Sequence, residues 1–423
     1  PPFAARALAA DRAAPLRALA AAAPRPVASV TWDISGPLQA ALTAPEGTPG
    51  RARRVAAVRV VPRPPAAPPG GGHPSPLVTS LVSWRGVVRG GHDLFGTELA
   101  ALEPEAVRRG VRDVLDSGAR AVAVTATGAP ASVDHEAALA AELLARRPDL
   151  KLCLSHESGG LGLLEREAAT VLNAALLEVA DRVITSCEQA TEALPGAPAC
   201  WFATGDGGRV TGRRLRWTPV VGLAARTAAA LIGAARTARV SDAVVALTDA
   251  DEITIGQVRD GLPHVETDLT DGNGIRTCLP QPVLTRIPVH TPSAATLLAT
   301  RSRHTSDVVA ALSPAGAAVA EALAHPDHGG PQHIHPRADL TAVGAALTEP
   351  SAWVDILVPT DGPKCLEQHQ RDAEQRALGL VAAHGAEPGS AYVVRSTATA
   401  AGYLRVYRLQ VRAASRTCAE VGR

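Results

Sequence analysis

The chain has 423 residues, of which 46% are apolar and 20% charged, and its formal net charge is +1. The near-neutral balance argues against a nucleic-acid binder, which needs a clustered basic surface. The apolar content argues against disorder throughout. At about 100–200 residues per domain, this length predicts two or three compact units.

The sequence also indicates a compartment. No run of about 18 apolar residues lacks Arg or Asp, so no membrane-spanning helix and no membrane partner are expected. The N-terminal stretch is rich in Ala and Arg but lacks the segment order of a signal peptide. The six cysteines are scattered and form no Cys-x-x-Cys pair, as is typical of small core residues in a reducing compartment. We therefore expect a cytoplasmic protein.

The first half of the chain predicts alternating helices and strands. Residues 1–28 are Ala-rich and helical in pattern, and the Pro-rich stretch 62–76 predicts a surface loop. From residue 103 onward, apolar spacing of the helical or buried-strand type recurs in turn. It predicts helices over 103–118, 134–147 and 163–184, and strands over 119–127 and 151–157.

The second half predicts fewer elements. Residues 242–249 form a β-branched run that ends in Asp and is typical of a buried strand. A helical pattern over 367–385 precedes two alternating strands, 390–400 and 403–413, separated by a Gly-containing turn. Strand–helix alternation with a β-rich end predicts an α/β fold.

One segment, 154–174, combines chemistry-bearing residues with a glycine loop. A strand would deliver Ser155, His156 and Glu157 to its carboxyl end, where ligand sites of α/β proteins usually lie. Gly159 and Gly162 then allow a tight loop into a helix. An ordinary strand–loop–helix connection explains the same pattern without any chemistry, and both interpretations stay open on spacing alone.

The same segment resembles the hydantoinase A/5-oxoprolinase family, especially its short single-chain form. The resemblance is carried by the Ser-His-Glu triplet, the glycine loop, the run Leu-Leu-Glu-Arg-Glu at 163–167 and the Asn-Ala pair at 173–174. It continues over residues 89–108, over the turn 204–212 and over the closing 385–413. The match therefore covers most of the chain and is weakest over 1–28 and 290–335.

The resemblance implies an α/β fold of the actin-like ATPase (ribonuclease H-like) type, with two lobes, a nucleotide cleft and a C-terminal β-hairpin region. On this basis we expect one lobe over 1–200, a shortened second lobe over 201–345 and the hairpin region over 346–423. It also implies ATP and a divalent metal as cofactors, and the hydrolytic opening of a cyclic amide such as a hydantoin or 5-oxoproline.

Matching positions supply candidate residues for that activity. By resemblance, His156, Glu157 and Asp249 are the catalytic candidates, with His156 or Glu157 as general base. Asp206, Gly207 and Gly208, in the Asp-Gly-Gly turn, and Thr254, after the strand 242–249, are the corresponding cofactor-binding candidates.

The chain departs from the family at its nucleotide loops. The loop after residue 248 reads TDADEITIG, in which Ala250 and Asp251 stand where the family has glycines. Such glycines let backbone N–H groups approach phosphate oxygens, and an acidic side chain there repels them. The glycine-bearing first phosphate loop and adenosine loop also have no counterpart. The sequence thus predicts weak ATP binding and, as an alternative function, a non-catalytic family member that acts as a subunit or scaffold.

A separate histidine-rich stretch could hold a metal. His325, His328, His333 and His335 supply imidazole nitrogens at close spacing, which would suit zinc or nickel. A solvated His- and Pro-rich loop explains the stretch equally well. The expected partners are a small cyclic amide or a partner subunit, and an oligomer is compatible with either.

Overall fold

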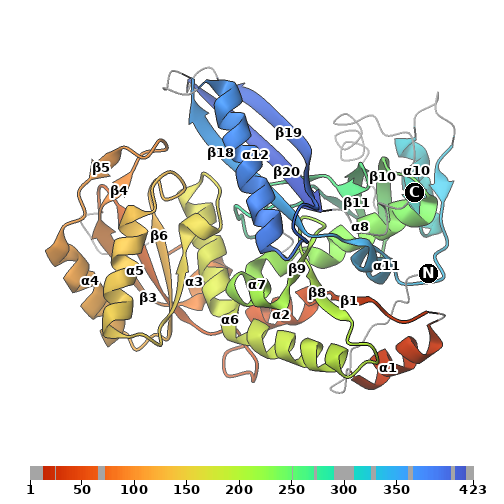
Figure 1. Cartoon of the computed structure of the whole chain (residues 1–423), viewed down its shortest axis with the longest axis horizontal. Helices are drawn as coiled ribbons and strands as arrows, with labels where there is room; N and C mark the ends of the chain where they lie inside the picture. The colour runs from red at the N-terminus through yellow and green to blue at the C-terminus, as the bar shows by residue number, and fades with distance from the viewer. Residues whose placement is uncertain are drawn as a thin grey trace.

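The computed structural model describes residues 13–23, 25–64, 72–249, 251–270, 274–289, 309–324, 330–360, 365–401 and 405–415. Four sheets of three or more strands form a mixed α/β architecture, with the parallel sheet at one end of the molecule and two further sheets at the other (Figure 1).

The first sheet is entirely parallel, in the order β3-β2-β6-β7. Successive residues of β2 face opposite cores: Val55 and Ala57 pack with α6 and α3, whereas Ala56 and Val58 pack with α4 and α5. This burial on both faces explains why its strands are continuous apolar runs. The elements are β2 (Val55–Val61), α3 (Pro76–Leu81), β3 (Val82–Arg89), α4 (Pro104–Asp116), β6 (Ala121–Ala126), α5 (Asp134–Arg146), β7 (Lys151–Leu154) and α6 (Leu163–Glu192). A small hairpin, β4 (Gly91–His92) and β5 (Glu98–Ala100), follows β3.

A three-stranded sheet brings the N-terminal part of the chain to its middle. Strand β1 (Ser29–Trp32) runs parallel to β8 (Ala199–Ala203), which pairs antiparallel with β9 (Arg209–Thr211). The helices near this sheet are α1 (Ala13–Ala22), α2 (Ser35–Thr43) and α7 (Gly212–Trp217), with a 3₁₀ turn η2 at Pro219–Gly222. Helix α6 is long enough to reach from the first sheet to this one (Figure 1).

A third sheet, in the order β12-β11-β10-β16-β17 with β15 paired to β11, has helices on both faces. Val245 of β10 packs with α8, and the adjacent Val244 and Ala246 pack with α10. Its elements are α8 (Ala225–Ala238), β10 (Ala243–Thr248), β11 (Glu252–Arg259), β12 (Leu262–Pro263), β15 (Thr285–Pro288), β16 (Val309–Ala311), α10 (Pro314–Leu323), β17 (Gln332–His333) and α11 (Leu340–Leu347). Strands β13 (Val265–Glu266) and β14 (Gln281–Pro282) form a separate pair.

The C-terminal part is an antiparallel sheet, β18-β20-β19, with α12 on one face. Ala373, Ala377 and Val381 of α12 are buried against Val354 and Val411 of the sheet. The elements are β18 (Ser351–Pro359), α12 (Leu366–Ala383), β19 (Ala391–Ala401) and β20 (Val406–Ser415).

Several elements confirm the sequence prediction. The helices at 103–118, 134–147, 163–184 and 367–385 are present as α4, α5, α6 and α12, and the final strand pair as β19 and β20. Within residues 104–290, β6 and β7 pair in parallel, whereas β10 and β11 pair antiparallel. The strand expected over 151–157 ends at Leu154 and continues as a 3₁₀ turn, η1 (Ser155–Glu157).

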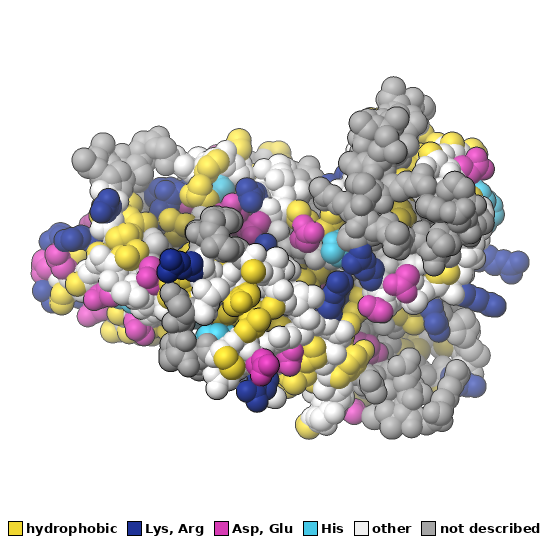
Figure 2. Space-filling model, turned by 90° about the horizontal axis from the view of Figure 1, so that it is seen from above, with side chains coloured by type: hydrophobic (Ala, Val, Ile, Leu, Met, Phe, Trp, Pro, Cys, Tyr) yellow, Lys and Arg dark blue, Asp and Glu magenta, His cyan; other side chains and the backbone are white. Residues whose placement is uncertain are grey.

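Charged side chains of both signs are mixed on the surface. On the face shown in Figure 2, Arg and Lys side chains are interspersed with Asp and Glu over the described part of the chain.

Among the described residues, one helical stretch, Pro219–Ala238, is long and apolar enough to cross a membrane by its length and composition. Its apolar 18-residue window is 56% buried within the protein, as in a core helix of a globular protein.

Candidate functional site

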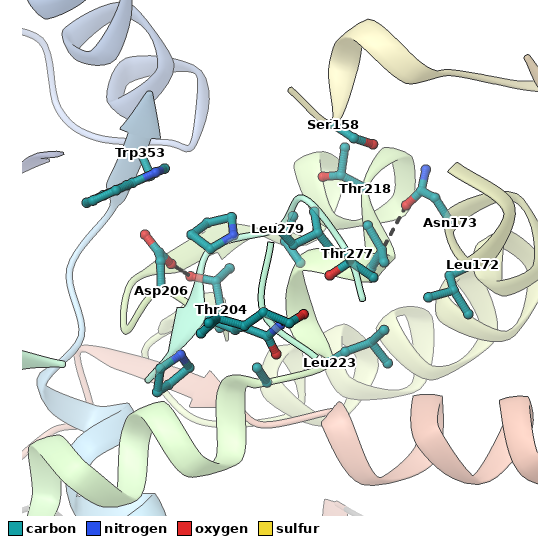
Figure 3. A pocket seen from close by; sticks show the side chains of 18 of the residues that line it. Ser158, Leu172, Asn173, Thr204, Asp206, Thr218, Leu223, Thr277, Leu279 and Trp353 are labelled. Carbon is teal, nitrogen blue, oxygen red and sulfur yellow. Dashed lines mark hydrogen bonds between the residues drawn. The ribbon is translucent and has the colours of Figure 1, made fainter. Parts of the chain in front are cut away.

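A cavity of about 690 Å³ lies where the connection between β7 and α6, the β8–β9 turn and the C-terminal sheet meet. This volume is typical of small-molecule sites. Figure 3 shows Asp206 and Trp353 on one side of the cavity and Ser158, Asn173 and Thr218 on the other. Glu157, Arg214 and His384 are ionisable side chains of the lining, and none of them forms an ion pair among the described residues.

Glu157, like Asp206, is a sequence candidate that the structure places in the cavity lining. It ends η1, is exposed at the cavity, and accepts no hydrogen bond from the described residues. Desolvation raises the pKa of Glu157 above its usual range, and the charges of His156 and Arg214 offset this only in part. A carboxyl with a raised pKa can deliver a proton near neutral pH.

His384 also lines the cavity, and sequence reasoning missed it. It follows the last residue of α12, and its Nδ1 lies 2.6 Å from the backbone oxygen of Ser351. Since a carbonyl can only accept, Nδ1 carries the proton and Nε2 is left as an acceptor. Burial lowers the pKa of His384, and the positive charge of Arg214 acts in the same direction. The ring is therefore neutral at pH 7 and suited to accept a proton.

Arg214 projects into the same cavity from α7. Its backbone is held by the helix cap, in which the N–H of Arg214 donates to the hydroxyl of Thr211 over 3.3 Å. Its side chain makes no ion pair among the described residues, and its Nε is buried without a hydrogen-bond partner. The cavity therefore contains an unneutralised guanidinium group.

Asp206 is a buried part of the cavity wall. Its carboxylate accepts hydrogen bonds from the hydroxyls of Thr204 and Ser351 and from the backbone N–H of Gly208, while Arg412 donates to its backbone oxygen. Burial opposes ionisation, but Arg412 and these hydroxyls hold the pKa of Asp206 below its usual range. Asp206 is thus an ionised residue that joins the β8–β9 turn to the C-terminal sheet.

Gly207 and Gly208, predicted to bind a cofactor, pack against protein. Gly207 has a φ of +84°, and a Cβ built there would lie 2.5 Å from Cδ of Pro263. A Cβ on Gly208 would lie 1.9 Å from the hydroxyl of Ser351. The glycines of this turn allow close packing between sheets, and the space that a phosphate group would need beside them is filled.

His156 lies next to the cavity and is held by a buried carboxylate. Glu136 of α5, which is 0% exposed, accepts from the backbone N–H and hydroxyl of Ser155 and from the backbone N–H and Nδ1 of His156. Arg166, also buried, donates to the hydroxyl of Ser155 and to the backbone oxygen of Ala126. This network fixes η1 and thereby the position of Glu157.

Two further polar residues of helix α6, Glu167 and Asn173, also bind other parts of the protein. The buried Glu167 is paired with Arg59 over 2.5 Å and with Arg85 on the neighbouring strand. Asn173 donates to the backbone oxygen of Trp217 and accepts from the N–H of Val220. Most of the segment that carries the family resemblance therefore ties α6 to the sheet and to the α7–η2 region.

Asp249 and Thr254 lie at a different place, in the β10–β11 hairpin. The N–H of Asp249 donates to the backbone oxygen of Glu252 over 2.9 Å, which closes the turn. Asp249 is exposed, and Thr254 is half-buried opposite Leu247. Neither residue is part of the cavity lining, although Glu252 is.

The histidine-rich stretch is only partly described. His325 and His328 fall outside the described residues, whereas His333 and His335 are exposed on or beside β17. Within the described ranges, no three His, Cys, Asp or Glu side chains come close enough to hold a metal ion. The proposed metal site thus stays a prediction.

Comparison with known proteins identifies the fold. No family model and no curated protein matches the sequence. Two solved structures resemble it over most of its length. An ATP-dependent caprolactamase from Pseudomonas jessenii has a TM-score of 0.64 at 12% identity, with 93% of this chain and 79% of that chain covered. A nucleotide-free acetone carboxylase has a TM-score of 0.58 at 11% identity, with 90% and 78% covered. The chain shares the fold of these two proteins.

Proposed function

We propose that this protein is a hydrolase that opens a cyclic amide of the hydantoin or 5-oxoproline type. The observation that carries the proposal is that Glu157 and His384 line one cavity, where burial raises the pKa of the carboxyl and lowers the pKa of the imidazole. Membership of the hydantoinase/oxoprolinase family and an actin-like two-lobed arrangement belong to the same proposal. They are supported by the motif at 154–174 and by the fold shared with an ATP-dependent caprolactamase.

The reaction follows from the two groups. Nε2 of His384 accepts a proton from water as the water oxygen attacks the carbonyl carbon. The C–N bond then breaks while the carboxyl of Glu157 donates its proton to the leaving nitrogen. The product is a single open chain with a carboxylic acid at one end and, at the other, an amine from 5-oxoproline or a ureido group from hydantoin. Proton exchange with solvent restores both side chains. Water attack and nitrogen departure thus each have a residue that moves the proton.

The phosphates of the nucleotide implied by the resemblance do not fit the residues at the expected positions. Pro263 and Ser351 fill the space beside Gly207 and Gly208. The hairpin after β10 presents the exposed Asp251 and the carboxylate of Glu252, which is engaged by Arg286 over 3.4 Å. Negative charge at this turn would repel phosphates. The mechanism above therefore contains no step that uses ATP.

The close packing around Gly207 and Gly208 favours a second function, that of a non-catalytic subunit or scaffold in the cytoplasm. A chain that has lost its nucleotide loops could keep its fold for association with a partner subunit or with copies of itself. In that case the division into parts 1–200, 201–345 and 346–423 would reflect ancestry rather than catalysis.

Ring opening of hydantoin, 5-oxoproline and 2-pyrrolidone, followed by NMR with and without ATP and magnesium, tests the proposal. We expect turnover of at least one compound without ATP. Glu157→Gln and His384→Gln should each lower kcat by about 100-fold or more. Glu321→Gln, at an exposed residue away from the cavity, is the matched control. Absence of turnover with all three compounds would leave the scaffold function.

A further inference from the structure

The cavity contains one arginine whose charge has no counterpart. Arg226 pairs with Asp33 over 3.2 Å and Arg286 pairs with Glu252 over 3.4 Å. Arg214, in contrast, has no ion-pair partner among the described residues, and its Nε is buried without a hydrogen bond. A buried donor without a partner is costly, so such a group marks a place where a ligand supplies the acceptor.

The other ionisable groups of the cavity do not neutralise Arg214. The carboxylate of Asp206 is already held by hydroxyls and a backbone N–H, and Arg412 lies beside it. The charges of Glu157 and Arg214 act on each other, but the two side chains form no ion pair, and His384 donates from Nδ1 to a backbone oxygen. The donors of the Arg214 guanidinium group therefore have no acceptor among the described residues, and a carboxylate of the ligand would supply one.

We propose that the small molecule taken by this cavity carries a carboxylate, and that Arg214 binds it. This inference rests on the proposed function and names the substrate class as an acidic cyclic amide. The planar guanidinium group can donate two parallel hydrogen bonds to a carboxylate, which fixes the orientation of the ring. A carboxylate on Arg214 leaves Glu157 and His384 free for the amide.

The test compares ligands that differ only in acidity. Calorimetry measures binding of 5-oxoproline against 2-pyrrolidone, and of hydantoin-5-acetic acid against hydantoin. We expect at least one acid to bind about tenfold or more tightly than its neutral counterpart, the usual effect of a charge-assisted hydrogen bond. Arg214→Gln should remove this preference and leave binding of the neutral ring. Arg213→Gln, one residue away on α7 but exposed and outside the cavity lining, should keep it.

A second measurement covers the case in which Arg214→Gln fails to fold. In the wild-type protein, a carboxylate on Arg214 would screen the positive charge near His384, so the acid should raise the pKa of His384 in NMR titrations and the neutral ring should not. Equal binding of both members of each pair, absence of acid binding, or a preference that survives Arg214→Gln would each overturn the inference.

These outcomes separate the inference from the proposed function. Turnover of cyclic amides without any preference for the acid leaves the hydrolase and overturns the role of Arg214. Binding of the acid through Arg214 without turnover supports the carboxylate subsite and overturns the hydrolase.

Discussion

Oε2 of Glu136 lies 2.7 Å from Nδ1 of His156. This contact gives His156 a structural role that its neighbour Glu157 does not share. His156 belongs to a buried hydrogen-bond network, whereas Glu157 projects into the cavity without a hydrogen-bond partner among the described residues. A structural interpretation of the triplet would require a buried, paired glutamate. The structure has one, but it is Glu136 from the preceding helix.

Thermal and denaturant unfolding should therefore distinguish three variants. Glu136→Ala leaves buried donors of Ser155 and His156 unsatisfied and should cost about 3–5 kcal/mol of unfolding free energy, as breaking a buried polar pair does. His156→Ala removes one partner and should cost about 1–3 kcal/mol. Glu157→Ala should change stability by no more than about 0.5 kcal/mol. A large loss for Glu157→Ala would show that its side chain is structural.

The two histidines near the cavity should contribute to the pH dependence of stability with opposite signs. The hydrogen bond that His156 donates to Glu136 raises the pKa of His156, so its contribution is complete below about pH 6.5 and is lost as the pH rises through the folded-state value. Burial lowers the pKa of His384, so its contribution is present above about pH 6.5 and is lost as the pH falls.

Unfolding free energies of the wild-type protein, His156→Gln and His384→Gln between pH 5 and 8, about the range in which histidine titrates, measure both effects. The difference between wild type and His156→Gln should shrink at high pH, and that between wild type and His384→Gln should shrink at low pH. Differences that change in the same direction would contradict this assignment.

The sequence predicts local elements better than it predicts the site. The helix over 163–184 has a clear apolar period, and the structure extends it to Glu192. The cavity instead depends on residues far apart in sequence: Glu157 on η1, Arg214 on α7 and His384 after α12. No short motif connects them, because packing of the C-terminal sheet against the β8–β9 turn brings them together. Glu157 was found because it follows a predicted strand and lies in the segment that carries the family resemblance.

The glycine turn shows the same limit. Gly207 and Gly208 suggest a phosphate-binding loop, since glycine is what such a loop needs. Glycine is equally what two closely packed backbones need, and only the positions of Pro263 and Ser351 distinguish the two. The sequence around these glycines contains no signal that distinguishes phosphate binding from close backbone packing.

Two glycines with the same φ allow a direct measurement of this packing. Gly207 and Gly196 both have a φ of +84°, but a Cβ on Gly196 would meet nothing within 4 Å. Gly196→Ala should therefore cost only the conformational strain, about 1–2 kcal/mol. Gly207→Ala should cost a further 1–3 kcal/mol or so, because the methyl group meets Pro263. If both variants lose the same unfolding free energy in denaturant unfolding, Pro263 moves aside without an energetic penalty.

ATP with magnesium should bind no better than about millimolar, or −4 kcal/mol, in calorimetry. The hairpin after β10 carries Asp249, Asp251 and Glu252 within four positions, and one like-charge contact at 4 Å opposes binding by about 4 kcal/mol at an effective dielectric constant of 20. If this charge is the cause, Asp251→Asn should strengthen binding, while Asp260→Asn, in the turn between β11 and β12, should not. Micromolar binding by the wild-type protein would contradict the prediction, because the acidic hairpin would then face away from the phosphates.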